Sequence, residues 1–114
     1  MKGAWHASPA EAARAPLPEG RRSALLLEHG SLEVRYYAPK GTDPQTPHER
    51  DEVYVVARGT GTFVRGTERV AFGPGTMLFV PARTAHRFED FSGDLATWVL
   101  FYGPLGGERD DPFV

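Results

Sequence analysis

The sequence predicts an all-β domain, a jelly-roll-like antiparallel β-barrel preceded by a short N-terminal helix. Short runs of β-branched and aromatic residues recur along the chain, and glycines and prolines separate them. The 13 glycines and 10 prolines are spread between these runs instead of forming one low-complexity segment. A chain of 114 residues has room for one core, so we expect its short strands to close on one another and bury their edges.

Each element has its own local signal. Ser8 can cap a helix, Pro9 suits its first position and Glu11 completes a capping box, which predicts a short helix ending near Arg14. Alternating runs predict strands at residues 24–28, 32–38, 52–57, 62–65, 68–72, 76–80, 85–88 and 95–102. We therefore divide the chain into an N-terminal extension (1–22), a barrel (23–103) and a C-terminal tail (104–114), which we expect to be loosely held.

Composition excludes several classes of function. The net charge is −2 and no block of basic residues occurs, so nucleic-acid binding is not expected. The longest apolar run, 96–102, is far too short to cross a membrane, and no apolar run follows Lys2 as in a secretory signal, so a cytoplasmic location is expected. The chain has no cysteine, so any metal must be held by nitrogen and oxygen ligands.

A concentration of titratable residues lies in the stretch TPHERDEVYVVARGTG, residues 46–61. His48 and Glu52 flank the start of a predicted strand, four residues apart, and even spacing in an extended chain places both side chains on one face. His86 stands at the start of a second predicted strand. Two imidazoles and one carboxylate would form a facial triad suited to Fe(II), Mn(II), Zn(II) or Ni(II). Alternatively, His48 and Glu52 are an exposed pair and His86 belongs to the core.

Four residues of the first half match one motif of a known family. Gly41, His48, Glu52 and Gly59 follow the first cupin motif, which is glycine, five residues, H-x-H, three or four residues, glutamate, six residues and glycine. Only four residues separate Gly41 from position 46, one fewer than in this pattern. Asp51, next to Glu52, should face the opposite way and is expected to be a surface acid.

The second half carries the second motif. Gly75, then Pro81 after five residues, and then His86 follow its pattern of glycine, five residues, P-x-G, two residues and histidine. The chain therefore resembles a small single-domain cupin over about residues 30–102. The resemblance implies a cupin-type barrel with a small-molecule pocket, a divalent metal ion on His48, Glu52 and His86, and commonly a homodimer.

Three positions depart from the family pattern. Thr46 stands where the first histidine should be, Arg83 replaces the glycine of the second motif, and Asp90 replaces its asparagine. The site would thus keep three ligands unless Gln45 or a water molecule replaces the fourth. Substrate would occupy the open coordination positions, including the one beside Thr46.

Further pocket candidates are Tyr54, Arg83, Phe88, Trp98 and Tyr102. Tyr54 would either offer its phenol to a ligand or fill the barrel with its ring. Arg83, in the turn before His86, could clamp a carboxylate or phosphate, or else face solvent. Phe88 would share the face of His86, and Trp98 and Tyr102 lie an even number of residues apart and are expected to share one wall.

The resemblance leaves three functions open. The first is a metal-binding cupin that binds a small organic molecule and performs oxygenase, isomerase or lyase chemistry. The second is a non-catalytic barrel that binds or senses a small ligand with an incomplete metal site. The third is a structural dimerisation barrel, although such a barrel would need none of His48, Glu52 and His86.

Overall fold

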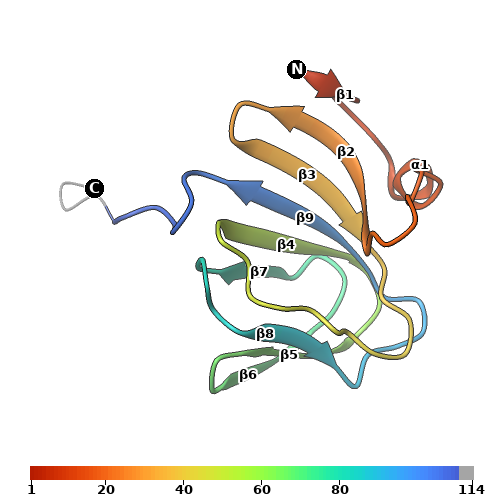
Figure 1. The fold of residues 1–114 in the computed structure, drawn as a ribbon. Helices are drawn as coiled ribbons and strands as arrows, with labels where there is room; N and C mark the ends of the chain where they lie inside the picture. The colour runs from red at the N-terminus through yellow and green to blue at the C-terminus, as the bar shows by residue number, and fades with distance from the viewer. Residues whose placement is uncertain (111–114) are drawn as a thin grey trace.

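The structure is a computed structural model that describes residues 1–110 of the chain. The chain forms one short helix and a series of antiparallel strands (Figure 1), so the predicted all-β class is confirmed. In chain order the elements are β1 (Lys2–Gly3), α1 (Pro9–Ala13), β2 (Ser23–His29), β3 (Leu32–Tyr37), β4 (Asp51–Arg58), β5 (Gly61–Arg65), β6 (Glu68–Phe72), β7 (Met77–Val80), β8 (His86–Glu89) and β9 (Ala96–Tyr102).

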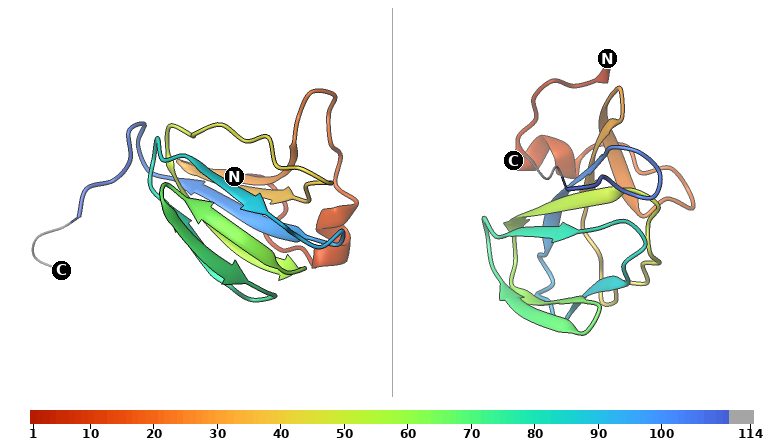
Figure 2. Two further views of the ribbon diagram at one scale, coloured as in Figure 1. Left: turned by 90° about the horizontal axis from the view of Figure 1, so that it is seen from below. Right: turned by 90° about the vertical axis from the view of Figure 1, so that its left-hand side faces the viewer.

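Two sheets form the walls of the barrel. The larger sheet has six strands in the order β1-β2-β3-β9-β4-β7, and the smaller has three in the order β6-β5-β8. Figure 2 shows the two sheets as facing layers, with α1 outside them. The last strand, β9, lies between β3 and β4, so it joins the two halves of the larger sheet.

The core fills the space between the sheets. In β4 the even-numbered side chains point inward, and Tyr54 and Val56 are almost fully buried there. The smaller sheet contributes Phe63 and Phe88, whose rings contact the ring of Tyr54 edge-on at 5.7 and 5.1 Å. Because successive side chains of a strand point to opposite faces, each central strand has one row of side chains in the core and another row on the outer face.

All eight strands expected from the sequence are present, and their ends differ from the expected ones by no more than one residue. Strand β1 was not predicted, because two residues carry no periodic signal and pair only through tertiary contact with β2. Gly3 permits this pairing: a Cβ atom built on it would lie 2.1 Å from the carbonyl oxygen of Leu26.

The predicted capping box is present at the start of α1. The Glu11 amide donates to Ser8 Oγ at 3.1 Å, and the Ser8 amide donates to Glu11 Oε1 at 2.9 Å. The helix ends at Ala13, and Ala12 packs on the outer face of the larger sheet against Tyr36 and Ala96. The predicted helix is therefore confirmed in place and length.

The start of the tail and Asp51 both differ from the expectation. Asp51 does point away from Glu52, but it is buried, with 4% of its surface exposed, because the C-terminal segment covers it. Its two carboxylate oxygens accept from the amides of Ala82 at 2.9 Å and Glu108 at 2.8 Å. The amide of Gly106 also donates to the carbonyl of Glu49 at 2.7 Å. The prediction of a loose tail was therefore wrong up to residue 108, and residues 111–114 lie outside the described part.

The outer face of the larger sheet carries an apolar row. Strand register places Val34, Leu100, Val53 and Phe79 side by side on four neighbouring strands, and Phe79 is 38% exposed. Partly exposed apolar rows of this kind occur at protein interfaces. Formation of a homodimer stays a prediction. Among residues 1–110, no helix has the length and hydropathy that crossing a bilayer requires.

Candidate metal centre

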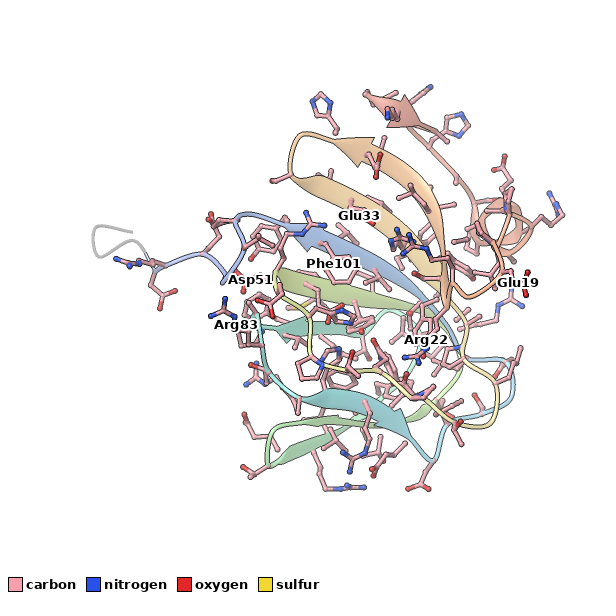
Figure 3. The ribbon with its side chains drawn as sticks, in the orientation of Figure 1. Glu19, Arg22, Glu33, Asp51, Arg83 and Phe101 are labelled. Carbon is pink, nitrogen blue, oxygen red and sulfur yellow. The ribbon has the colours of Figure 1, made fainter. Side chains whose placement is uncertain are left out.

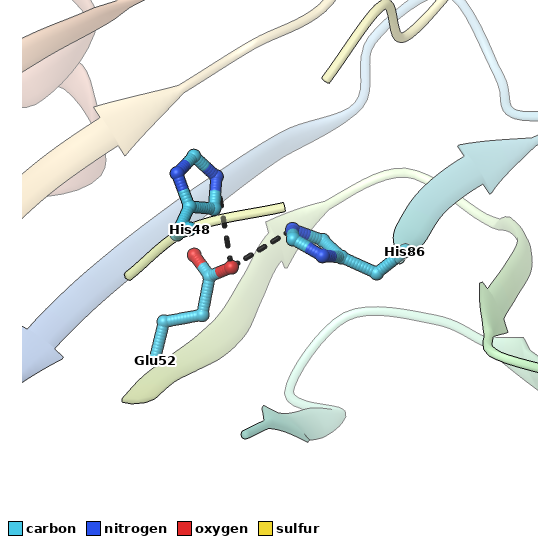
Figure 4. Close-up of side chains that lie close together, drawn as sticks. All are labelled: His48, Glu52 and His86. Atoms are coloured by element: carbon cyan, nitrogen blue, oxygen red, sulfur yellow. Dashed lines mark ion pairs between the residues drawn. The ribbon is translucent and has the colours of Figure 1, made fainter. Parts of the chain in front are cut away.

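Three side chains from distant parts of the chain meet in the barrel. His48 lies just before β4, Glu52 is the second residue of β4, and His86 begins β8 in the opposite sheet. Their ligand atoms all lie within 4.8 Å of one another. Figure 4 shows Glu52 between the two imidazoles, with its Oε1 at 2.8 Å from His86 Nε2 and 3.7 Å from His48 Nε2. The arrangement could hold a divalent metal ion.

Local strand geometry explains this convergence. Glu52 pairs with Val80 of β7, and both belong to the inner rows of their strands. In β8 the pattern of buried and exposed residues points His86 and Phe88 inward. Glu52 and His86 are almost completely buried, whereas the side chain of His48 is 34% exposed. The cluster is therefore closed on the core side and accessible from the His48 side.

Three of the ligand atoms of the cluster lack a hydrogen-bond partner in the protein. Both carboxylate oxygens of Glu52 and Nε2 of His86 are buried, and within residues 1–110 none of them forms a hydrogen bond of acceptable geometry. The 2.8 Å contact between Glu52 Oε1 and His86 Nε2 is therefore a close approach of two metal-ligating atoms without a directed hydrogen bond. Leaving such groups unpaired costs about 1–3 kcal/mol each. A cation bound between them would remove this cost, so the residues fit a metal ion.

The orientation of His86 suits a metal ligand. Its Nδ1 lies 2.8 Å from the backbone carbonyl of Thr84, which can only accept a hydrogen bond. In neutral His86 the ring proton must therefore sit on Nδ1, and the lone pair of Nε2 points toward Glu52. Two lone pairs at this distance repel each other, so a proton or a metal ion is needed between them. No side-chain pattern could reveal this orienting partner, because it is a main-chain carbonyl.

The two histidines respond differently to the same carboxylate. Burial lowers the pKa of His48, and the charge of Glu52, with its nearer oxygen 3.7 Å away, offsets this only in part. Burial would also lower the pKa of His86, but Glu52 at 2.8 Å outweighs it and the pKa is raised. The two pKa values therefore shift in opposite directions, and in the metal-free protein His86 takes up a proton at a higher pH than His48.

A hydrogen-bonded chain of side chains lies beside the cluster. Gln45 Nε2 donates to Asp43 Oδ2 at 2.8 Å, and the hydroxyl of Tyr54 donates to Gln45 Oε1 at 2.8 Å. Because an ionised carboxylate only accepts, Asp43 fixes the Gln45 amide with its oxygen toward the cluster, 3.3 Å from His48 Nε2. Gln45 thus offers an oxygen where Thr46 leaves out a histidine. Burial raises the pKa of Tyr54 well above its ordinary value, so its phenol stays protonated.

Asp43 is a site residue that sequence reasoning missed. It also accepts from the amide of Phe88 at 2.8 Å and from the hydroxyl of Tyr37. It therefore joins the loop before β4 to strands of both sheets and fixes the position of Gln45. The segment around Asp43 reads as an ordinary polar loop, so the only sequence signal was its nearness to the first motif.

A cavity of about 440 Å³ opens from the cluster. Gln45, Thr46 and Tyr54 line it together with His48 and Glu52, whereas Arg83, Phe88, Trp98 and Tyr102 do not. Trp98 and Tyr102 are absent because alternate residues of β9 face opposite sides of the sheet, and Val99 and Phe101 face the cavity. Trp98 and Tyr102 share the outer row, where Trp98 contacts Tyr36 edge-on at 5.1 Å. Phe88 is buried in the core instead.

Arg83 and Asp90 show why the family pattern has other residues at their positions. Arg83 adopts a φ of 65° and Asp90 a φ of 49°, and they are the only residues other than glycine with positive φ in the described chain. Glycine adopts this conformation without strain, and Asn and Asp tolerate it better than most residues. The Arg83 side chain is 66% exposed and pairs with Glu49 at 2.9 Å. Arg83 thus shares a backbone shape with the glycine of the family pattern, and the side chain of Arg83 lies at the outer rim.

Comparison with known proteins supports the class that fold and site define, a small antiparallel barrel with a histidine–carboxylate cluster. The family model described as "Cupin domain" matches residues 33–102. An uncharacterised protein of Streptomyces coelicolor is 41% identical over 81 residues, which cover 69% of this chain and 77% of that protein. The chain therefore belongs to the cupin family.

Solved structures show the same fold. A cupin 2 conserved barrel domain protein from Salinispora arenicola matches with a TM-score of 0.65 and 16% identity, over 89% of this chain and 91% of that one. A chain from the crystal structures of DMSP lyases matches with a TM-score of 0.57 and 27% identity. That match covers 66% of this chain and 40% of the other.

Proposed function

We propose that this protein is a metal-dependent enzyme of the lyase class that acts on a small organic molecule in the barrel. The observation that carries the proposal is the convergence of buried, unpartnered donor atoms of Glu52 and His86 beside His48, at a point that opens onto a cavity. A bound divalent ion would supply Lewis-acid polarisation of a substrate oxygen. The likeness to a DMSP lyase chain favours bond cleavage of this class over other cupin reactions.

The chain's own residues have distinct roles in this proposal. His48, Glu52 and His86 would hold the ion, and the cavity on the side of Thr46 would admit a ligand to it. Gln45 presents its carbonyl oxygen beside the cluster, and hydrogen bonds from Tyr54 and to Asp43 fix this oxygen in place. The inner wall of buried aromatic rings limits the access of water from the core side. A ligand would thus meet an ion and an acceptor oxygen within one enclosed space.

Metal content tests the proposal directly. Protein purified without chelator or an affinity metal is expected to carry close to one divalent ion per chain by elemental analysis. The double variant H48A/H86A should lose the ion while it keeps the circular dichroism spectrum of a β protein. Refolded metal-free protein that takes up none of Fe²⁺, Mn²⁺, Zn²⁺ and Ni²⁺ would overturn the proposal.

A second function is supported by Thr46, which leaves the site one histidine short. In that case the barrel binds or senses a small ligand and releases it unchanged. Metal-loaded protein would then gain thermal stability from a ligand without forming product. Product detected by mass spectrometry would remove this second function and support the lyase.

The protonation of His86 makes metal binding depend on pH. A proton competes with the ion below the raised pKa of His86, so the apparent affinity should fall about tenfold per pH unit there. In the metal-free protein the stability changes with pH in the opposite direction to the metal affinity. A raised pKa adds stability that is fully present below the unfolded value of 6.5 and is lost as the pH rises through the folded pKa. Thermal melts from pH 6 to 8.5 with chelator should therefore show falling stability, and H86Q should abolish this trend.

A further inference from the structure

We propose that the substrate is a small dicarboxylate, with one carboxylate at the metal centre and the other on a wall of arginines formed by Arg22 and Arg35. The first contact rests on the proposed metal-dependent function, whereas the second rests on independent features of the cavity.

The cavity carries an excess of positive charge on the side away from the metal cluster. Among the residues that line it are three glutamates, of which Glu52 belongs to the cluster and Glu49 pairs with Arg83 outside the cavity. Only Glu33 remains to balance the arginines on this side. These arginines are Arg21, Arg22, Arg35 and Arg50. Such a charge distribution attracts anions into the cavity.

The arrangement around Glu33 shows that these arginines suit a carboxylate. Arg35 Nε donates to Glu33 Oε1 at 2.5 Å, and Arg50 Nη2 donates to Glu33 Oε2 at 2.6 Å. Each oxygen thus takes one guanidinium, and the trio keeps one net positive charge. The side chains of Glu33 and Arg35 are only 19% and 16% exposed, so water screens this charge weakly.

Two guanidinium groups keep donors for a further carboxylate. Arg35 Nη1 reaches the carbonyl of Ser23 at 3.2 Å, and Arg22 Nη1 donates to the carbonyl of Pro44 at 2.5 Å. Within residues 1–110 the Nη2 groups of Arg35 and Arg22 form no hydrogen bond with the protein. Arg22 directly precedes Ser23, the residue that Arg35 contacts, and both arginines line the cavity. A carboxylate there would receive two charge-assisted hydrogen bonds.

The aromatic ring of Phe101 on β9 lies between Glu52 on β4 and Glu33 on β3, and Arg35 lies two residues farther along β3. The ring of His48 meets the Phe101 ring edge-on at 5.0 Å, and the guanidinium of Arg50 lies 5.7 Å from its centre. Figure 3 shows Phe101 beside Glu33 on the neighbouring strand, with Arg22 and Arg83 toward opposite sides of the view. A ligand that touches both ends must therefore span this ring, which requires a chain of several carbons. The cavity of about 440 Å³ has room for one.

Calorimetry on metal-loaded protein tests the inference with malonate, succinate, glutarate and adipate. Each diacid is compared with its monoamide, which keeps the size and loses one charge. We expect one of the longer diacids to bind at least tenfold tighter than its monoamide, because a hydrogen bond to a charged group contributes about 1.5–3 kcal/mol. R35Q should remove this preference, and so should R22Q, whose exposed position makes misfolding a lesser concern.

Two further variants sharpen the test. E33Q removes the internal carboxylate that competes for Arg35 and Arg50, so it should raise the affinity for the diacid. R69Q, on β6 outside the cavity, removes an arginine that pairs with Glu89 at 2.8 Å and should leave the preference unchanged.

The outcomes separate this inference from the proposed function. Equal binding of diacids and monoamides by a protein that does hold a metal ion would overturn the dicarboxylate and leave the metal centre in place. A preference for diacids that depends on Arg35 in a protein without metal would overturn the metal centre and support the arginine wall. A preference that survives both R22Q and R35Q would show that the wall has another role.

Discussion

The variant E52Q is expected to lower the affinity for a divalent ion by more than the roughly 10–100-fold that loss of an outer-shell partner costs. The reason is geometric, because Oε1 of Glu52 is the atom that both His86 and His48 approach, at 2.8 and 3.7 Å. A glutamine side chain has the same shape but no negative charge, so it keeps the packing and replaces a charged ligand by a weaker, neutral one. Competition with a fluorescent chelator measures the change.

The stability of this variant provides a second readout. In metal-free protein at a pH above the raised pKa of His86, where no proton joins the pair, E52Q removes a buried carboxylate without a hydrogen bond, so the free energy of unfolding should stay equal or rise. With metal present, wild type gains stability by mass action and E52Q does not. The matched control is E68Q on β6, where Glu68 is 69% exposed and pairs with Arg65 at 2.8 Å. If E52Q and E68Q bind metal equally well, the cluster is not a metal site.

The variant G59A is expected to lose about 3 kcal/mol or more of the free energy of unfolding. Gly59 follows β4 and has a φ of 95°, a conformation that costs an alanine about 1–2 kcal/mol. An added Cβ would also lie 2.6 Å from Cα of Leu95, which is backbone and cannot rotate away. Leu95 is fully buried, so the turn before β9 would have to move as a unit.

The variant G66A is the control for this prediction. Gly66 also has a positive φ, at 58°, but nothing lies within 4 Å of an added Cβ. We expect it to lose only about 1 kcal/mol, through backbone strain alone. Urea unfolding measures both variants, and equal losses would show that the contact between Gly59 and Leu95 has no energetic weight.

Local patterns located most of the fold. Alternation of apolar residues placed all eight longer strands, and Ser8 and Glu11 placed the helix, because these signals act between neighbours in the chain. Spacing also brought His48 and Glu52 to one face of a strand start, and the second motif supplied His86. The spacing of the two family motifs thus predicted that Glu52 on β4 and His86 on β8 lie together. Patterns within a single strand contain no information on such a contact.

Other features depended on contacts between distant segments. Strand β9 is apolar on both faces, so its sequence does not show which alternate residues face the cavity. The sequence therefore places Trp98 and Tyr102 in the pocket, whereas Val99 and Phe101 line it. The burial of Asp51 depends on residues 103–108 folding back over it. Asp43 and Thr84 act on the site through a loop carboxylate and a backbone carbonyl, neither of which has a periodic signal.

The sequence by itself determined the family, the order of the strands along the chain and the three candidate ligands, because periodicity and motif spacing are written in the order of residues. Only the tertiary structure decided which face of β9 meets the cavity, that Gln45 is oriented by Asp43, and that Glu33 lies between Arg35 and Arg50. These features arise when strands pair across the sheet and a loop closes over it, and the distances that set their energies do not exist in the unfolded chain.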